Sequence, residues 1–395
     1  MSYTILNQPT SPNGTITNLV YTVSSSLATQ PQFRYVADIY ESGSSDLLTR
    51  IKAYPNDFET GVFDVAHILN DYAYGGLWGM YSTPNAAHDQ TAIKNYHIEF
   101  GEEYAPSLSG SATIYTASAT TDIAVFPAVV EPNAGSWNFP SASYLDTNPL
   151  LSNSPYYTED NPKPINFNDY EVVNILFYGQ LQGSPQLVID GTSYFIPRSL
   201  PSDTEYHVFN IPVGPQNYKN NATIYNNFAN GFTNVEIRVA LDGDIVKYYF
   251  VNAENCNYEP TRFMFINKFG VWEFYTVNYP QNKSTSVDRS NYTSTAVNYN
   301  SANPQYDISR RGMTQYYTNY TDRYQVTTDW LTTDEANWLT ELIESPNVGV
   351  WNSTTEQFIP ANITNGNYTW KTNPRGQKVF QYTIEYQFTN KRFSR

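Results

Sequence analysis

The sequence predicts a mainly β protein, built from two or three domains of β-sandwich or jelly-roll type with one short α-helix near the C-terminus. Three observations support this prediction. A chain of 395 residues is longer than one ordinary sandwich and has room for two or three domains. Charged residues make up 15% of it and aromatic residues 16%, with 35 tyrosines, which suits strands with polar but uncharged outer faces. Short apolar or alternating segments recur between turn-forming residues, as strands require.

Residues 1–105 are predicted to form a fibronectin-like or immunoglobulin-like β domain. The segment 31–40, PQFRYVADIY, alternates in the way of a strand. A turn rich in serine and glycine joins it to LLTRIKAYP at 47–55, which predicts a hairpin. Apolar residues at near-helical spacing in 61–72 favour a short helix or helical turn, and 95–104 predicts a further strand.

Residues 106–255 are predicted to form a second β-sandwich domain with long loops. Its first part, 106–168, is rich in serine, threonine, proline and asparagine, which is typical of loops. A series of strand patterns follows. Asp190-Gly191 and Asp242-Gly243 are predicted to be hairpin turns. Fragments of this kind also occur in calcium-binding loops, but the terminal glutamate of such a loop is missing in both places.

Residues 256–395 are predicted to form a C-terminal β domain. The densest apolar run of the chain, at 256–280, predicts a buried hairpin around an Asn-Lys-Phe-Gly turn. Phe265, Phe269 and Trp272 are expected in its core. The polarity then rises, and 282–306 is expected to be a loop or an extended arm.

The one helix that the sequence predicts with a complete set of signals lies at 333–344. Thr332 and Glu335 match the capping box, in which each side chain bonds to the other's backbone N–H. Trp338 and Leu342 lie on its apolar face and are expected to dock it against the C-terminal sheet. Proline 346 ends the helical pattern.

No catalytic, cofactor-binding or metal-ligating residue can be assigned from the sequence. The four histidines, His67, His88, His97 and His207, lack the spacing of metal ligands or of a catalytic triad. Phosphate-binding glycine loops and the nucleophile elbow are missing as well. The chain is therefore expected to be no enzyme and to need no cofactor.

Charge and hydropathy limit the partners. The net charge is −15 and no segment concentrates lysine and arginine, so nucleic acid is not expected as a direct partner. No run of apolar residues approaches the ~18 of a membrane-spanning helix. A secretory leader is also missing, which predicts synthesis in the cytoplasm. The single cysteine, Cys256, excludes an intrachain disulfide and is expected to be buried.

Several segments resemble a known group of proteins. They include FRYVADIY with LLTRIKAYPN, GVFDVAHILNDY, YHIEFGEEY and EPTRFMFINKFGVWEFYTVN. Together these segments resemble loosely characterised virion structural proteins of tailed bacteriophages of marine and Bacteroidetes hosts. The segment 330–351, WLTTDEANWLTELIESPNVGVW, is similar to the terminal region of tail-tip or baseplate proteins.

This resemblance implies a structural protein of the virion, made in the host cytoplasm and located in the tail, baseplate or neck. Its partners would be further copies of itself in a cyclic homo-oligomer and other virion proteins. The resemblance carries no active-site residues. An alternative hypothesis is a receptor- or glycan-binding adhesin, in which tyrosines of residues 106–250 stack on the sugars of a host surface glycan. A polysaccharide-degrading enzyme with two carboxylates far apart in the sequence is a third.

Overall fold

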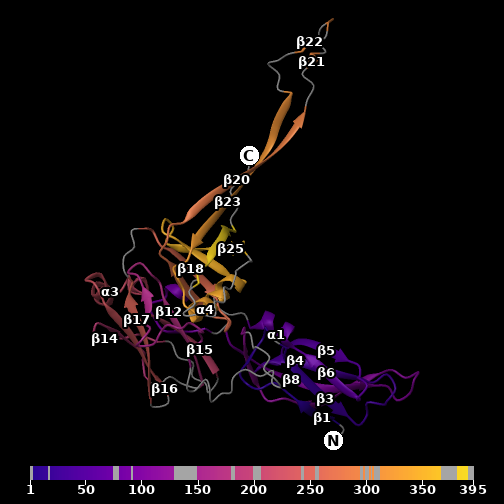
Figure 1. Cartoon of the computed structure of the whole chain (residues 1–395). Coiled ribbons are helices and arrows are strands. Elements are labelled where there is room, and N and C mark those ends of the chain that lie inside the picture. The colour runs from indigo at the N-terminus through magenta and orange to yellow at the C-terminus, as the bar shows by residue number, and fades with distance from the viewer. Residues whose placement is uncertain are drawn as a thin grey trace, which may run out of the picture. The chain divides into compact units, whose positions relative to one another are not determined.

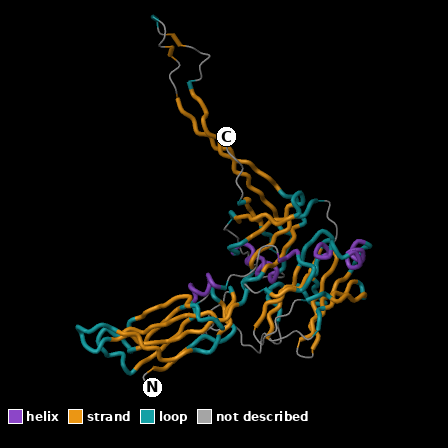
Figure 2. The backbone as a smooth tube through the Cα atoms, turned by 180° about the vertical axis from the view of Figure 1, so that it is seen from behind, coloured by secondary structure: helices purple, strands orange, loops and turns teal. Residues whose placement is uncertain are grey.

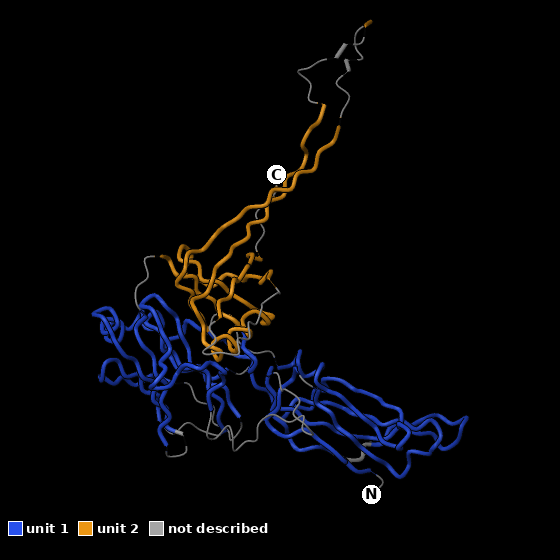
Figure 3. Tube along the Cα trace, viewed as in Figure 1, with its two compact units in different colours: residues 1–255, 266–273 blue, residues 256–265, 274–395 orange. Residues whose placement is uncertain are grey.

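The protein is mainly β, as predicted, with strands in several sheets and a few short helices (Figure 1). The computed structural model describes residues 3–16, 18–73, 80–89, 92–128, 149–178, 183–198, 206–241, 244–253, 258–293, 297–298, 302–303, 305–306, 312–365 and 380–389. The chain forms two compact units (Figure 3). Unit 1 is Met1–Asn255 with Ile266–Glu273, and unit 2 is Cys256–Phe265 with Phe274–Arg395. One predicted domain boundary, between residues 255 and 256, coincides with a boundary between the units.

The first part of unit 1 contains two sheets that enclose a common core, and their strands pair antiparallel except for β2 and β10, which pair in parallel. One sheet has the order β1-β3-β6, and the other has the order β2-β10-β8-β4-β5 with β9 also paired to β8. Buried aromatic side chains from both sheets, such as Tyr21 and Phe100, fill the core. The strands are β1 Tyr3–Asn7, β2 Asn13–Gly14, β3 Val20–Ser25, β4 Arg34–Glu41, β5 Leu47–Ala53, β6 Thr60–Asp64, β8 Lys94–Tyr104, β9 Thr113–Ala119 and β10 Ile123–Phe126.

Most of the strands predicted in this part are confirmed. β4 and β5 form the predicted hairpin, and β8 is the predicted strand at 95–104. The segment 61–72 divides into the end of β6 and helix α1, Ala66–Tyr72, because Gly61 and Phe63 are buried while Val62 between them is exposed. The six-stranded sheet that contains β8 extends beyond residue 105, since β9 and β10 both pair with β8.

The second part of unit 1 also has two sheets around one core. Their orders are β11-β17-β16-β13-β14 and β12-β15-β7, and side chains such as Phe209 and Phe250 come from both. The elements are η1 Met80–Ser82, β7 Ala87–His88, β11 Lys163–Ile165, β12 Val172–Tyr178, β13 Gln186–Ile189, β14 Thr192–Phe195, β15 Tyr206–Pro212, η2 Pro215–Tyr218, α3 Ala222–Ala229, β16 Asn234–Leu241 and β17 Asp244–Asn252.

The turns of this part follow their sequence signals. Asp190 and Gly191 have φ angles of 44° and 86° and join β13 to β14, which confirms the predicted hairpin. β16 and β17 pair from Asn234↔Val251 to Leu241↔Asp244, so they too form a hairpin, while its two turn residues lie outside the described part of the chain. Helix α3 was not predicted. Its N-cap is Asn221, whose side chain accepts a hydrogen bond from the backbone N–H of Ile224.

Unit 2 is organised by a seven-stranded sheet of order β19-β18-β24-β25-β26-β23-β20. At one edge of this sheet, β23 and β20 pair antiparallel. β18 and β19 are neighbours, which confirms the predicted hairpin at 256–280, whereas Cys256 and the predicted turn at 373–376 lie outside the described residues. The elements are β18 Thr261–Ile266, β19 Trp272–Val277, β20 Asn282–Thr293, β21 Val297–Asn298, β22 Gln305–Tyr306, β23 Met313–Thr327, α4 Thr333–Glu344, β24 Val348–Asn352, β25 Gln357–Ile363 and β26 Thr383–Phe388.

Helix α4 has the predicted bounds and the predicted capping box. The Thr332 hydroxyl accepts from the backbone N–H of Glu335 at 3.3 Å, and the Glu335 carboxylate accepts from the backbone N–H of Thr332 at 2.7 Å. Helix α1 lies in the segment 61–72, where a short helix or helical turn was favoured, and α3 is described in addition to the predicted helices. No helix among the described residues is long and apolar enough to cross a membrane.

Removing the cap of α4 is expected to cost about 1 kcal/mol of stability, because Thr332→Ala leaves a backbone N–H of the first turn without its acceptor. Chemical denaturation of the purified chain measures this cost. Thr333→Ala is the matched control, since this exposed neighbour does not cap the helix. Equal effects of the two substitutions would contradict the capping role.

Candidate functional site: an arm and the grooves at its base

A long two-stranded ribbon extends from the sheet of unit 2 (Figure 1). β20 and β23 pair from Asn282↔Gln325 to Thr293↔Met313, but β23 pairs with β26 only over Tyr324–Thr327. In the described part of the chain, residues 284–293 and 313–323 therefore have no strand neighbour other than each other. We call residues 284–323 the arm, and residues 290–317 the outer arm. Figure 2 shows the same ribbon from behind.

The arm exposes both of its faces. Every residue of β20 except Ser290 is exposed. Several large side chains of the arm are exposed too, namely Val287 (39%), Tyr292 (50%), Met313 (65%), Tyr316 (64%) and Tyr317 (43%). A two-stranded ribbon is marginally stable on its own in water, and its free edges can pair with another strand. Such an arm gains stability when a partner covers it.

The sequence predicted a loop or an extended arm at 282–306, and the structure shows an arm made of strands. Its return strand, β23, was not predicted. The reason is that serine, threonine and asparagine lie on both faces of the ribbon, so neither strand shows the alternation that marks a half-buried strand.

An aromatic cluster lies where the arm joins the sheet, made of Tyr324, Tyr386 and Phe388. The rings of Tyr324 and Tyr386 are stacked, with centroids 5.3 Å apart and an angle of 15°. Phe388 meets both edge-on, at 5.1 Å from Tyr324 and 5.7 Å from Tyr386. Tyr386 is fully buried, and burial raises the pKa of its hydroxyl above the usual value. The mutual ring contacts and the burial of Tyr386 hold these side chains in place beside the two grooves described next.

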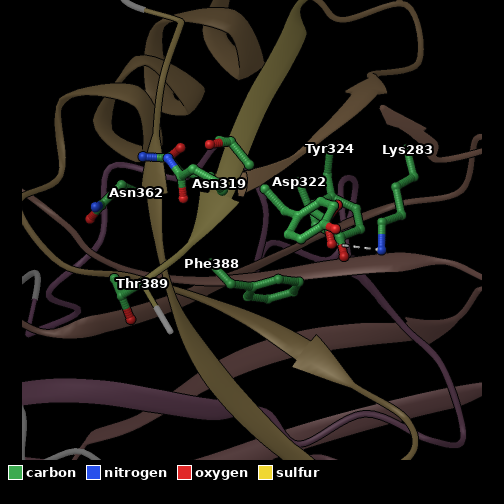
Figure 4. A pocket seen from close by; sticks show the side chains of 10 residues that line it. Lys283, Asn319, Asp322, Tyr324, Asn362, Phe388 and Thr389 are labelled. Carbon is green, nitrogen blue, oxygen red and sulfur yellow. Dashed lines mark ion pairs between the residues drawn. The ribbon is translucent and has the colours of Figure 1, made fainter. Parts of the chain in front are cut away.

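The first groove has a volume of about 580 Å³ and lies beside β20, β23, β25 and β26 (Figure 4). The ammonium of Lys283 lies 3.0 Å from the Asp322 carboxylate, and this hydrogen bond raises the pKa of Lys283. The Thr285 hydroxyl donates to the same carboxylate at 2.6 Å. The lining residues are Lys283, Asn319, Tyr320, Thr321, Asp322, Tyr324, Asn362, Gln387, Phe388 and Thr389.

The second groove, of about 470 Å³, shares Tyr324 and Phe388 with the first groove, and Tyr386 lines the second groove alone. Its outer wall carries two more large aromatic residues, Tyr258 and Trp351. Tyr258 is 54% exposed, whereas the Trp351 ring is held edge-on against Phe358 at 5.2 Å. Both grooves thus combine aromatic rings with polar, mostly uncharged side chains.

The histidines, for which no role was predicted, do not gather into one site. His88 and His207 do meet, since Nε2 of His88 lies 3.1 Å from Nδ1 of His207. His67 is exposed, and Nδ1 of His97 lies 3.6 Å from the Asp122 carboxylate. A group of three or more side chains able to hold a metal ion does not occur among the described residues.

One ion pair lies deep in unit 1. The ammonium of Lys163 is 2.9 Å from the Glu171 carboxylate and 2.7 Å from the Tyr157 hydroxyl, and the side chains of Lys163 and Glu171 are 5% and 0% exposed. Each charge has a close partner, so the arrangement satisfies buried charges in the core. No pattern in the sequence predicts this ion pair.

The residues predicted to pack in the C-terminal domain are largely buried. Phe265, Trp338 and Leu342 are 0%, 2% and 0% exposed and belong to unit 2. Trp272, which is 6% exposed, and Phe269 belong to unit 1 rather than to the predicted C-terminal domain, and Phe269 is half-buried against an apolar cluster of unit 1. None of these five residues lines either groove.

The tyrosines of residues 106–250 that were predicted to stack on sugars do not form the grooves. Tyr157, Tyr218 and Tyr248 are buried in a core, and Tyr115 and Tyr178 are exposed without lining either groove. Sequence reasoning missed the groove residues because they come from four strands that are distant in the chain.

Comparison with protein-family models found no match, and comparison with curated proteins found none either.

Proposed function

We propose that this chain is a structural component of a tailed-bacteriophage virion, in the tail, baseplate or neck, and that its arm joins it to neighbouring subunits. The arm carries this proposal, because it exposes apolar side chains and unpaired strand edges far beyond the sheet that supports it. The resemblance of several segments to virion structural proteins supports the proposed location in a virion.

The composition of the arm suits an interface between copies of an acidic chain. The whole chain has a net charge of −15, so like copies repel one another. The two paired strands of the arm carry as many arginines as aspartates, namely Asp288, Arg289, Asp322 and Arg323. The arm can therefore approach another subunit with little repulsion and little desolvation of charge.

The geometry favours head-to-tail assembly. A free strand edge adds to the sheet of another molecule through main-chain hydrogen bonds. When the arm of one subunit docks on a different surface of the next, the contact is heterologous, and a series of such contacts forms a ring when its rotation closes. The proposed assembly is such a cyclic homo-oligomer, which also holds other virion proteins.

A shortened arm tests the proposal. In this variant Arg289 is joined to Thr318 by an Asn-Gly turn in place of residues 290–317, because these two residues are directly opposite each other in the ribbon. All residues that line the grooves are kept. We expect the intact chain to form a defined oligomer in mass photometry and the variant to remain a folded monomer.

The controls separate assembly from folding. Thermal unfolding of the shortened chain should match that of the intact chain, since the outer arm adds nothing to either compact core. An exposed polar substitution outside the arm, Gln357→Ala, should leave the oligomer unchanged. Assembly of the shortened chain to the same oligomer would contradict the role of the arm, and the chain's absence from purified particles of the virus that encodes it would contradict the setting.

A second candidate, a glycan-binding adhesin, is favoured by one observation, the polar and aromatic lining of the first groove.

A further inference from the structure

Two side-chain amides of the first groove are uncommitted. Asn319 on β23 and Asn362 on β25 line the groove, and no described residue hydrogen-bonds to either side-chain amide. Figure 4 shows them together with Thr389 on one side of the groove. Each amide offers one acceptor oxygen and two donor hydrogens. The two amides can therefore both donate to and accept from a ligand, as a sugar hydroxyl requires.

The Thr389 hydroxyl adds a further acceptor in a fixed position. It donates to the backbone carbonyl of Pro360 at 3.1 Å, which holds its rotamer, and its lone pairs stay available. Because a folded strand end fixes this group, a ligand pays little additional entropy when it binds there.

Phe388 supplies a rigid apolar wall. Edge-on contacts to Tyr324 and Tyr386 hold its ring, at interplanar angles of 70° and 85°. One side of a pyranose ring presents a patch of C–H groups, which packs on an aromatic face through apolar contact and through the negative charge of that face. The Phe388 ring thus matches the C–H face of a sugar, and the neighbouring amides match its hydroxyl groups.

The charge of the groove is balanced. Among the described residues that line it, only Lys283 and Asp322 are charged, and they pair with each other at 3.0 Å. An acidic ligand would find no spare cation among these described lining residues and would approach a chain of net charge −15. The volume of about 580 Å³ lies in the range of small-ligand sites.

From these features we infer that the first groove binds a neutral oligosaccharide. Phe388 stacks on one sugar ring, and Asn319 and Asn362 hydrogen-bond to its hydroxyls. The inference does not rest on the assembly role of the arm, because every residue that it uses lies outside the outer arm.

A glycan array tests it. The full chain is applied to immobilised neutral and acidic oligosaccharides, and the best neutral one is then titrated by calorimetry. The double variant Asn319→Ala/Asn362→Ala should bind about tenfold more weakly, since two hydrogen bonds are lost. Phe388→Leu, which keeps an apolar side chain but removes the aromatic face, should weaken binding at least as much. Gln357→Ala, on β25 but outside both grooves, is the matched control.

The outcomes are distinct. Binding of a neutral oligosaccharide that both groove variants weaken, with unchanged circular dichroism and unfolding temperature, supports the site. Three results would overturn the site: no binding to the array at millimolar ligand, binding of acidic glycans alone, or binding that neither variant changes. A silent array together with lost self-association in the double variant would assign the groove to a neighbouring polypeptide and also overturn it. The shortened-arm chain should keep glycan binding, so failure of the assembly proposal and failure of this one are measured separately.

Discussion

Trp338→Ala is expected to lower the free energy of unfolding of unit 2 by about 3–5 kcal/mol, the usual cost of removing a large buried aromatic side chain. Trp338 is 2% exposed, and its ring centroid lies 6.1 Å from that of Phe265 on β18 and 5.7 Å from that of Tyr275 on β19. It therefore fastens α4 to the sheet, and the substitution leaves a cavity between the helix and two strands.

Trp330→Ala is the control for this prediction, because Trp330 is 62% exposed and precedes the same helix. Denaturant unfolding followed by tryptophan fluorescence and circular dichroism measures both variants. A loss below about 1 kcal/mol at Trp338, the size of a surface effect, would contradict the packing role of α4.

Alkaline pH is expected to unfold unit 1 cooperatively above about pH 10, the ordinary pKa of tyrosine. Burial raises the pKa of Tyr21, Tyr96, Tyr218 and Tyr248 above that value. Their raised pKa values stabilise the folded state fully below the unfolded pKa. This contribution is lost as pH rises toward the folded pKa, because only the unfolded chain releases the protons. Each group then costs about 1.4 kcal/mol per pH unit.

Tyrosinate absorbance should consequently rise in two phases, the second together with the loss of β-sheet circular dichroism. Tyr218→Phe removes one buried hydroxyl, which donates to the Pro212 carbonyl at 2.7 Å, and should make the fall of stability with pH shallower. Tyr54→Phe, at a residue that is 68% exposed, should not. A single ionisation phase with unchanged circular dichroism would show that burial does not protect these tyrosines.

The two proposals assign different tasks to adjacent parts of unit 2. Assembly uses the outer arm, and ligand binding uses the groove at its base. If both hold, subunits joined through their arms would present the groove in several copies, and many weak sugar contacts would add up to a strong attachment.

The features that the sequence predicted correctly are those with a local cause. Helix α4 follows from a capping box within four residues and from apolar side chains at helical spacing. The hairpin at Asp190 and Gly191 follows from turn residues that tolerate positive φ angles. Helix α3 has a capping asparagine too, but its Asn-rich sequence resembles the loops around it, so its pattern was not recognised.

The candidate site lacks a local cause. Lys283 lies on β20 and Asp322 on β23, and Asn362 and Phe388 belong to two further strands. These residues meet only because backbone hydrogen bonds place β20, β23, β26 and β25 side by side. The sequences of the separate segments do not predict that these strands are neighbours.

By itself the sequence determined the β class of the protein, its hairpin turns and the capped helix, because composition, turn chemistry and side-chain periodicity act over a few residues. Only the tertiary structure decided that β9 and β10 pair with β8, that polar strands pair into an arm, and that four strands form a groove. Long-range backbone pairing and the burial of whole faces decide which strands become neighbours in a sheet. The residues of one strand do not specify which distant strand will pair with it.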